Sequence, residues 1–230
     1  PLCRADMDAR GWDRPDFVYV TGDAYVDHPS FGVSIISRVL EDAGYRVAIL
    51  AQPDFRSCDA FREYGKPRLG FLVTSGNIDS MVAHYTAVKK HRSFDYYTPG
   101  GVMGKRPDRA VIVYTNRIRE AYGDVPVILG GLEASLRRFA HYDYWDNKVR
   151  RSILVDSRAD LLTYGMGENI LLRVAELLDR GVPIRKIRDV RGTVYLCDPA
   201  DPIHYDVAAT FDYNLLKTDK RAYAEAFGIQ

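Results

Sequence analysis

The sequence predicts an α/β fold with a doubly wound, mostly parallel sheet of the flavodoxin-like, Rossmann-type kind and helices on both faces. Short apolar runs of strand length alternate with segments whose apolar residues recur at helical spacing. The runs are continuously apolar, which is typical of parallel strands that are buried on both faces. With 230 residues, the chain is long enough for one such domain with a sizeable core.

The strands are predicted from apolar runs that end in glycine or in small polar residues. Each of the first five runs is followed by a segment with helical or loop character, as crossover connections between parallel strands require. A sixth, weaker run comes near the end of the domain. The predicted strands are residues 17–22, 46–51, 69–75, 125–129, 160–164 and 193–196.

The helices between these strands are predicted from apolar spacing, capping residues and closing glycines. Pro29 suits the first turn of the helix that follows the first strand. Residues 89–107 form a long loop, which is usually functional or mobile in a compact domain, and residues 132–157 are ambiguous between helix and loop. The predicted caps are Ser57, Asn77 and Asp108, and the predicted closing glycines are Gly44, Gly65 and Gly181.

Composition excludes several classes of protein. The formal net charge of +1 gives no electrostatic field for nucleic acid or a membrane surface. The longest apolar runs are far shorter than the roughly 20 residues of a membrane span, and no signal peptide is visible. Three widely spaced cysteines are typical of reduced thiols in a cytoplasmic protein.

Ligands of open parallel sheets bind beyond the carboxyl ends of the strands. Four loops at these ends are small, polar and rich in glycine, and each precedes a helix N-terminus, where free N–H groups favour phosphate or carboxylate. Each loop alone also suits an ordinary turn, but together they favour a ligand crevice. The candidate binding residues are Asp27, His28, Ser75, Asn77, Gly130, Gly131, Glu133, Ser135, Gly165, Gly167 and Glu168.

Common catalytic and nucleotide-binding motifs are missing from these loops. No Gly-x-Gly-x-x-Gly follows the first strand, and neither a Walker loop nor a Gly-x-Ser-x-Gly elbow is present. Asp27-His28 and the segment around His141 could supply a metal site or an acid/base pair, or they could be hydrogen-bonded loop residues. The basic, aromatic segment 137–151 could hold an anion or form a packed interface.

Several long strings resemble those of the YgiQ-type radical SAM proteins. They begin with Gly22-Asp23-Ala24-Tyr25-Val26-Asp27-His28-Pro29-Ser30-Phe31-Gly32, and the match runs to about residue 200. The other strings are residues 51–54, 98–101, 105–110, 130–138 and 140–145.

The resemblance implies a two-part protein. Residues 1–200 would be an N-terminal cobalamin-binding-like α/β domain, and residues 201–230 a linker or the start of the radical SAM domain, which is truncated here. The parent protein would be an enzyme that binds a 4Fe–4S cluster and S-adenosylmethionine. The fragment lacks three neighbouring thiolates for such a cluster, so its partner would be the missing C-terminal domain, along with an unknown small-molecule ligand.

Three functions remain open from the sequence. The domain could bind cobalamin, with an open crevice over Asp27, Ser75, Gly130 and Gly131. Because Asp27 and His28 are adjacent, they depart from the Asp-x-His-x-x-Gly pattern of base-off cobalamin domains, which favours a second function. This is a platform for domain packing or protein interaction that binds no corrin, with Tyr97, Phe139 and Trp145 on an apolar surface. The third is a self-sufficient metal-dependent enzyme that uses Asp27, His28 and Glu133.

Overall fold

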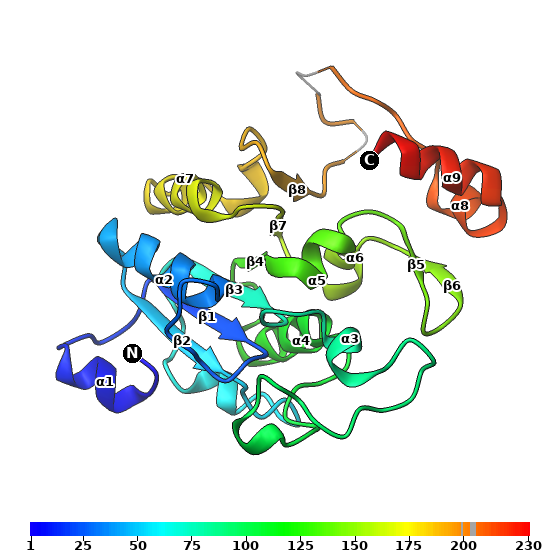
Figure 1. Ribbon diagram of the computed structural model, residues 1–230. Helices are drawn as coiled ribbons and strands as arrows, with labels where there is room; N and C mark the ends of the chain where they lie inside the picture. The colour runs from blue at the N-terminus through cyan, green and yellow to red at the C-terminus, as the bar shows by residue number, and fades with distance from the viewer. Residues whose placement is uncertain (199, 203–205) are drawn as a thin grey trace.

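The structure is a computed structural model, and it describes residues 1–198, 200–202 and 206–230. Its centre is a six-stranded sheet in the order β2-β1-β3-β4-β7-β8 (Figure 1). The first five strands in this order run parallel, and β8 runs antiparallel beside β7. The predicted fold class and flavodoxin-like strand order are confirmed. The strands are β1 (Phe17–Thr21), β2 (Val47–Ala51), β3 (Gly70–Thr74), β4 (Val127–Leu129), β7 (Leu161–Thr163) and β8 (Thr193–Tyr195).

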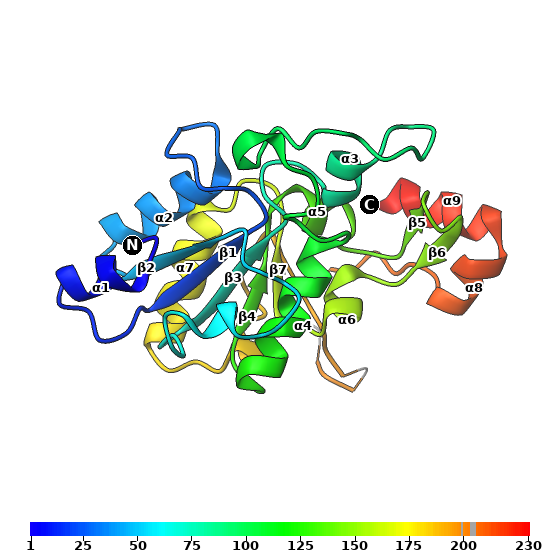
Figure 2. The ribbon, with the colours of Figure 1, turned by 90° about the horizontal axis from the view of Figure 1, so that it is seen from below.

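Helices cover both faces of the sheet, as Figures 1 and 2 show. On one face, α2 (Gly32–Asp42) and α7 (Glu168–Asp179) pack against each other and over the strands. On the other face, α4 (Ala110–Tyr122) and α6 (Ile153–Ser157) do the same. All five residues of β1 are buried because side chains alternate between these two cores.

The remaining elements of the body are short. They lie before the sheet, in its connections and after α7. They are α1 (Arg4–Ala9), the 3₁₀ turn η1 (Ala60–Arg62), α3 (Ser80–His84), η2 (Pro99–Gly101), α5 (Gly131–Leu136) and η3 (Ile184–Lys186). Gly44, Gly65 and Gly181 follow helical segments with positive φ, as predicted for closing glycines.

Four predicted helix starts were wrong. Ser57 does not cap the short helix, because η1 begins at Ala60 after Asp59 and has no side-chain cap. The helix after β1 begins at Gly32, three residues beyond Pro29. Asp79, and not Asn77, caps α3, because its carboxylate accepts from the backbone N–H groups of Met81 and Val82. The predicted extension of this helix to residue 88 is also wrong, since α3 ends at His84.

Asp108 does not cap α4, which starts at Ala110 without a side-chain cap from its preceding residue. Asp108 instead accepts hydrogen bonds from His84 Nδ1 at 2.6 Å and from the Tyr85 hydroxyl at 2.7 Å. Groups distant in sequence accept the first N–H groups of α4: Ser80 Oγ accepts from Ala110, and Glu133 Oε1 accepts from Val111. A cap of this kind has no local sequence signal.

The ambiguous segment 132–157 contains a hairpin that the sequence analysis missed. Strands β5 (His141–Asp143) and β6 (Lys148–Arg150) pair in antiparallel fashion outside the main sheet. Two C-terminal helices, α8 (Tyr213–Thr218) and α9 (Lys220–Ile229), pack on this hairpin around Leu216, Ala222 and Ala226. The last part of the chain is thus a small helical unit with its own apolar cluster.

The predicted boundary between residues 1–200 and 201–230 lies beside residues 199 and 203–205, which fall outside the described part of the chain. It stays a prediction. Among the helices that the structure describes, none combines the length and apolar character needed to cross a lipid bilayer.

Candidate functional site

The loops after the parallel strands meet along one edge of the sheet. This edge is formed by the carboxyl ends of β1, β3, β4 and β7, which end at Thr21, Thr74, Leu129 and Thr163. It is the edge at which open α/β sheets bind ligands. The loops that were predicted to lie at this edge follow these strands in the structure.

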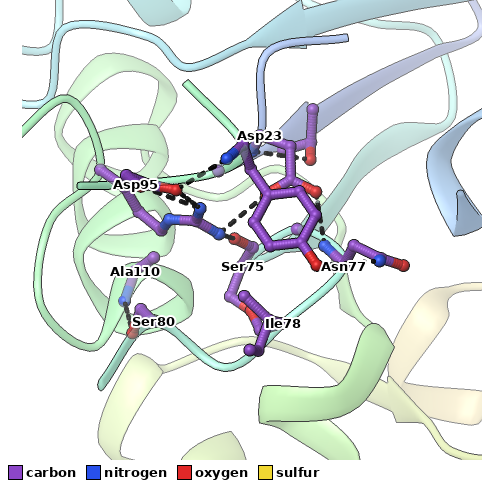
Figure 3. A network of polar contacts seen from close by, with 12 residues as sticks. Asp23, Ser75, Asn77, Ile78, Ser80, Asp95 and Ala110 are labelled. Carbon is purple, nitrogen blue, oxygen red and sulfur yellow. Dashed lines mark hydrogen bonds and ion pairs between the residues drawn. The ribbon is translucent and has the colours of Figure 1, made fainter. Parts of the chain in front are cut away.

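A long loop, residues 85–109, folds over the ends of β1 and β3. Its Arg106 side chain has no exposed surface. Arg106 Nη1 donates to Asp23 Oδ1 at 2.8 Å and to the Ser75 carbonyl at 2.7 Å, while Nη2 donates to both carboxylate oxygens of Asp95, at 3.0 and 3.1 Å. Figure 3 shows Asp23, Ser75 and Asp95, the three partners of this guanidinium. The loop is therefore tied to the sheet by a fully buried ion network.

Asp23 is the first charged residue after β1 and is buried at the centre of this network. Its second carboxylate oxygen accepts the backbone N–H of Asn77 at 2.6 Å. Burial raises the pKa of Asp23 to about 6, although the charge of Arg106 and the Asn77 N–H oppose the shift. Asp23 thus connects β1, the loop after β3 and the covering loop.

A small cleft of about 190 Å³ remains at this edge between the ends of β1 and β3 and the start of α2. It is lined by residues from β1, β3 and the N-terminal turns of α2 and α5. The lining residues are Tyr19, Thr21, Asp23, Phe31, Gly32, Val33, Thr74, Gly76, Asn77, Gly131 and Leu132. Small-molecule sites usually begin at roughly 300 Å³, so this cleft is smaller than a typical cofactor site.

At two glycines of this edge, other protein atoms occupy the position where a Cβ atom would lie. A Cβ atom on Gly22 would lie 2.1 Å from the Ser75 carbonyl oxygen, and one on Gly131 would lie 2.3 Å from Thr74 Oγ1. These glycines permit close packing between the strand ends. At the positions where their Cβ atoms would lie, both glycines face protein atoms rather than open space.

Glu133 lies apart from the cleft and is 1% exposed. Its Oε2 accepts from the N–H and hydroxyl of Ser80, and its Oε1 accepts from the N–H of Val111. Burial, aided by the charge of Asp79, raises the pKa of Glu133 against the opposing effect of Arg137. Glu133 therefore joins the starts of α3 and α4 to α5.

Asp27 and His28 lie on the surface, and neither meets Glu133. Asp27 pairs with Arg38 at 2.6 Å, and His28 Nδ1 lies 2.6 Å from Ser30 Oγ. Across residues 1–198, 200–202 and 206–230, no three histidine, cysteine or carboxylate side chains converge as metal ligands would. The structure thus does not bring together the three residues of the predicted metal enzyme.

The other predicted site residues divide between the network and the open part of the edge. Ser75 is buried, and its hydroxyl donates to the Ile78 carbonyl. Asn77 is exposed and lines the cleft. Gly130 directly precedes α5, and half-buried Ser135 lies within it. Gly165, Gly167 and Glu168 follow β7 and lead into α7, away from the cleft.

The three cysteines do not form a cluster site. Cys58 is buried, whereas Cys3 and Cys197 are exposed. A 4Fe–4S cluster needs neighbouring thiolates, and within the described residues no group of potential ligands meets this need.

Beyond the cleft, the edge presents large apolar side chains to solvent. We call Leu136, Phe139, Tyr164 and Met166 the apolar edge residues; they follow β4 and β7, and their exposed fractions range from 37% for Tyr164 to 84% for Met166. Arg138 lies over both the Phe139 and Tyr164 rings, at 5.2 and 5.1 Å from their centroids. Arg138 thus joins Phe139 and Tyr164, and exposed apolar side chains that lie together are typical of an interaction surface.

Only one of the three aromatic residues expected on an apolar surface belongs to this group. Phe139 is exposed, as predicted. Tyr97 is half-buried beside Phe31 and Arg106, and Trp145 is half-buried against Tyr85. Both pack into the body of the protein because the covering loop and the hairpin fold onto it.

Arg106 and Asp95 are functional partners at this edge that the sequence did not predict. Both lie in the loop that was predicted as long and irregular, where sequence spacing gives no contact. The available signal was an arginine followed by proline in that loop, together with an aspartate directly after the first strand. A buried arginine must find carboxylates, but the sequence does not identify which.

The sequence family described as "Radical SAM N-terminal" matches residues 1–230. A "UPF0313 protein" of Clostridium perfringens is 60% identical over the whole chain, which covers 35% of that relative's length. A "UPF0313 protein" of Clostridium botulinum is 57% identical, with 36% of its length covered. The chain thus spans about a third of the length of these relatives.

A solved structure shares the fold. It is the radical S-adenosylmethionine methyltransferase TsrM from Kitasatospora setae with tryptophan substrate and a SAM analogue bound. The TM-score is 0.51 at 18% identity, covering 78% of this chain and 28% of TsrM. A second structure of TsrM, with cobalamin and a 4Fe–4S cluster bound, gives the same TM-score at 19% identity. This likeness shows the fold alone.

Proposed function

Because the chain belongs to the radical SAM N-terminal family, we propose that it is the platform domain on which the rest of a longer radical SAM protein packs. The 4Fe–4S cluster and S-adenosylmethionine would be held by that remainder, outside these 230 residues. The single observation that carries the proposal is the group of exposed apolar edge residues, beyond the strand ends where open α/β sheets bind ligands.

The occupant of this surface would be the remainder of the longer chain. Relatives that match the whole chain have only about 35% of their length covered, so a large further part of the protein is available to cover it. In both ribbon views the C-terminal end of the chain lies closer to α5 than to the opposite edge strand β2 (Figures 1 and 2). A following domain could therefore reach the edge without crossing the sheet.

The buried network of Arg106 supports a platform rather than a corrin site. It fastens the covering loop over β1 and β3 with hydrogen bonds of 2.7–3.1 Å, and the cleft that remains holds about 190 Å³. Asp27 and His28 face solvent, each with a partner of its own, and supply no ligand at the centre of the edge.

Cobalamin binding is the second candidate function. The TsrM structure with cobalamin bound has the same fold, and Gly165, after β7, has nothing within 4 Å of where its Cβ would be. A corrin on this side would occupy the same edge as the proposed partner domain, so the two candidates compete for one surface.

The platform is tested by one substitution measured in two proteins. Met166→Asp places a charge on a side chain that is 84% exposed in this chain. We expect no change in the unfolding midpoint of the 230-residue chain, but a clear decrease in that of the longer protein, where the charge would be buried. Val88→Asp, at a residue that is 72% exposed in the covering loop, is the control and should affect neither. Equal midpoints for Met166→Asp and wild type in the longer protein would contradict the platform.

A further inference from the structure

The small cleft lies where the strand order of the sheet reverses. β2 lies next to β1 on one side and β3 lies next to β1 on the other, so the chain reverses its direction across the sheet after β2. Such a switch point leaves a crevice between the connections that diverge from neighbouring strands. The cleft opens there, between Thr21 at the end of β1 and Thr74 at the end of β3.

A buried tyrosine contributes a free hydroxyl to this cleft. Tyr19 lies in β1, is 6% exposed and lines the cavity. Its hydroxyl makes no hydrogen bond with any residue in the part of the chain that the structure describes, and burial alone raises the pKa of Tyr19. Among the described residues, the fully enclosed polar atoms without a partner do not include the Tyr19 hydroxyl. This hydroxyl therefore reaches the open space of the cleft, where it can donate to a bound group.

The N-terminus of α2 supplies two more donors. This helix has 11 residues, and its preceding residue Phe31 offers no side-chain cap. The N–H groups of Gly32 and Val33 have no acceptor among the described residues, and both residues line the cleft. The first N–H groups of a helix, together with its dipole, favour a negatively charged group.

The one carboxylate on the cleft wall is already engaged. Asp23 Oδ1 accepts from Arg106 and Oδ2 accepts from the N–H of Asn77. Asp23 N in turn donates to Thr21 Oγ1 at 3.3 Å, which leaves the Thr21 hydroxyl proton free for another acceptor. The charge of Asp23 is thus balanced by protein groups, and the hydroxyls of Tyr19 and Thr21 and the N–H groups of Gly32 and Val33 remain as donors.

We propose that this cleft binds the oxyanion group of a small ligand, a phosphate or a carboxylate, through the Tyr19 hydroxyl and the N–H groups of Gly32 and Val33. With about 190 Å³, the cavity holds roughly the volume of six water molecules at about 30 Å³ each. It accommodates the anionic group and a few further atoms, with Phe31 as an apolar wall. The site goes beyond the platform role and does not depend on it.

Two substitutions remove donors from the cleft wall. Tyr19→Phe removes the hydroxyl alone. Gly32→Pro removes one N–H at the first helical position, where proline is favoured; Phe31 already has the extended backbone that a following proline requires, and a Cβ at Gly32 would meet nothing within 4 Å. The matched controls are Tyr45→Phe and Lys220→Pro, the latter at the first residue of α9.

The test is a titration of the ¹⁵N-labelled chain with inorganic phosphate and, separately, with acetate. We expect one of these anions to shift the Gly32 and Val33 amide resonances saturably. Its affinity should fall about tenfold or more in Tyr19→Phe and in Gly32→Pro, as the loss of one hydrogen bond to a charged group implies, and should be unchanged in both controls. A response to phosphate or to acetate identifies the oxyanion. Unmoved Gly32 and Val33 amides with both anions, or equal affinity in all five proteins, would overturn the proposal.

Discussion

The guanidinium of Arg106 donates to the carboxylate of Asp23 across 2.8 Å, with no exposed surface on the arginine and 1% on the aspartate. The two residues are 83 positions apart in sequence. Their contact joins the end of β1 to the covering loop. The shape of the whole carboxyl edge near β1 and β3 depends on this pair and on Asp95, which holds the other side of the guanidinium.

Replacing Arg106 should destabilise the protein strongly. Arg106→Met leaves Asp23 and Asp95 buried without their cation, and such a loss costs about 3–5 kcal/mol. Urea denaturation of the variant measures it. Arg38→Met removes an arginine from the exposed ion pair with Asp27 and should leave the midpoint unchanged. Similar midpoints for the two variants would show that the network is not structural.

The stability contributed by Asp23 should depend on pH. The pKa of this carboxyl rises from 3.8 to about 6 on folding, so the folded state binds the proton more tightly than the unfolded state. Its contribution to stability is therefore greatest at low pH and is lost as the pH rises from about 4 to 6, by about 3 kcal/mol at most. We expect the difference in unfolding free energy between wild type and Asp23→Asn to change over this window. A difference that stays constant from pH 4 to 7 would contradict the shift.

Alanine substitutions at two glycines should distinguish the stability cost of a strained backbone from the cost of steric overlap. Gly131 and Gly181 both have φ of +80°, but a Cβ on Gly131 would lie 2.3 Å from Thr74 Oγ1, whereas one on Gly181 would meet nothing within 4 Å. Gly181→Ala should cost about 1–2 kcal/mol from the left-handed backbone alone. Gly131→Ala should cost about 1–3 kcal/mol more because of overpacking. Thermal unfolding of both variants gives the comparison, and equal costs would mean that the edge is loosely packed.

Glu133 should behave as a structural residue. Glu133→Ala leaves three buried donors unpaired, the N–H and hydroxyl of Ser80 and the N–H of Val111. At about 1–3 kcal/mol for each unsatisfied group, the unfolding free energy should fall by on the order of 3 kcal/mol or more. The control is Glu225→Ala on exposed α9. If Glu133→Ala were as stable as this control, the capping role of Glu133 would be wrong.

The sheet could be predicted from sequence because each parallel strand is a short apolar run with a distinct end. Residues 17–22 and 69–75 were predicted, and the structure has strands at Phe17–Thr21 and Gly70–Thr74. Burial on both faces makes such runs continuous. The edge of the sheet at which polar loops gather followed directly from the parallel arrangement.

The helix starts could not be predicted from local capping signals. Asn77 and Asp108 have suitable side chains, but tertiary contacts use them elsewhere: the backbone of Asn77 donates to Asp23, and Asp108 accepts from His84 and Tyr85. The N–H of Val111 in α4 is accepted by Glu133, 22 residues away. A cap supplied from another element leaves no trace in the sequence around the helix.

The hairpin β5–β6 escaped prediction because its strands are short and charged. Only Asp143 is buried among the residues of β5 and β6. The hairpin is stabilised by Arg109 and Arg150, which pair with Asp143 at 3.0 and 2.8 Å, and by α8 and α9 packing on it. A strand that is stabilised mainly by ion pairs has no apolar periodicity from which it could be predicted.

The central claim is that the carboxyl edge is a packing platform and not a corrin site. The most direct measurement is an absorbance titration of the 230-residue chain with hydroxocobalamin followed by gel filtration, with the structurally similar methyltransferase TsrM, which has been solved with cobalamin bound, as the positive control. We predict that the corrin absorbance elutes separately from this chain, since the closed network and the cleft of about 190 Å³ leave no slot for it. Co-elution of one equivalent of corrin with the chain would contradict the claim and establish a cobalamin domain.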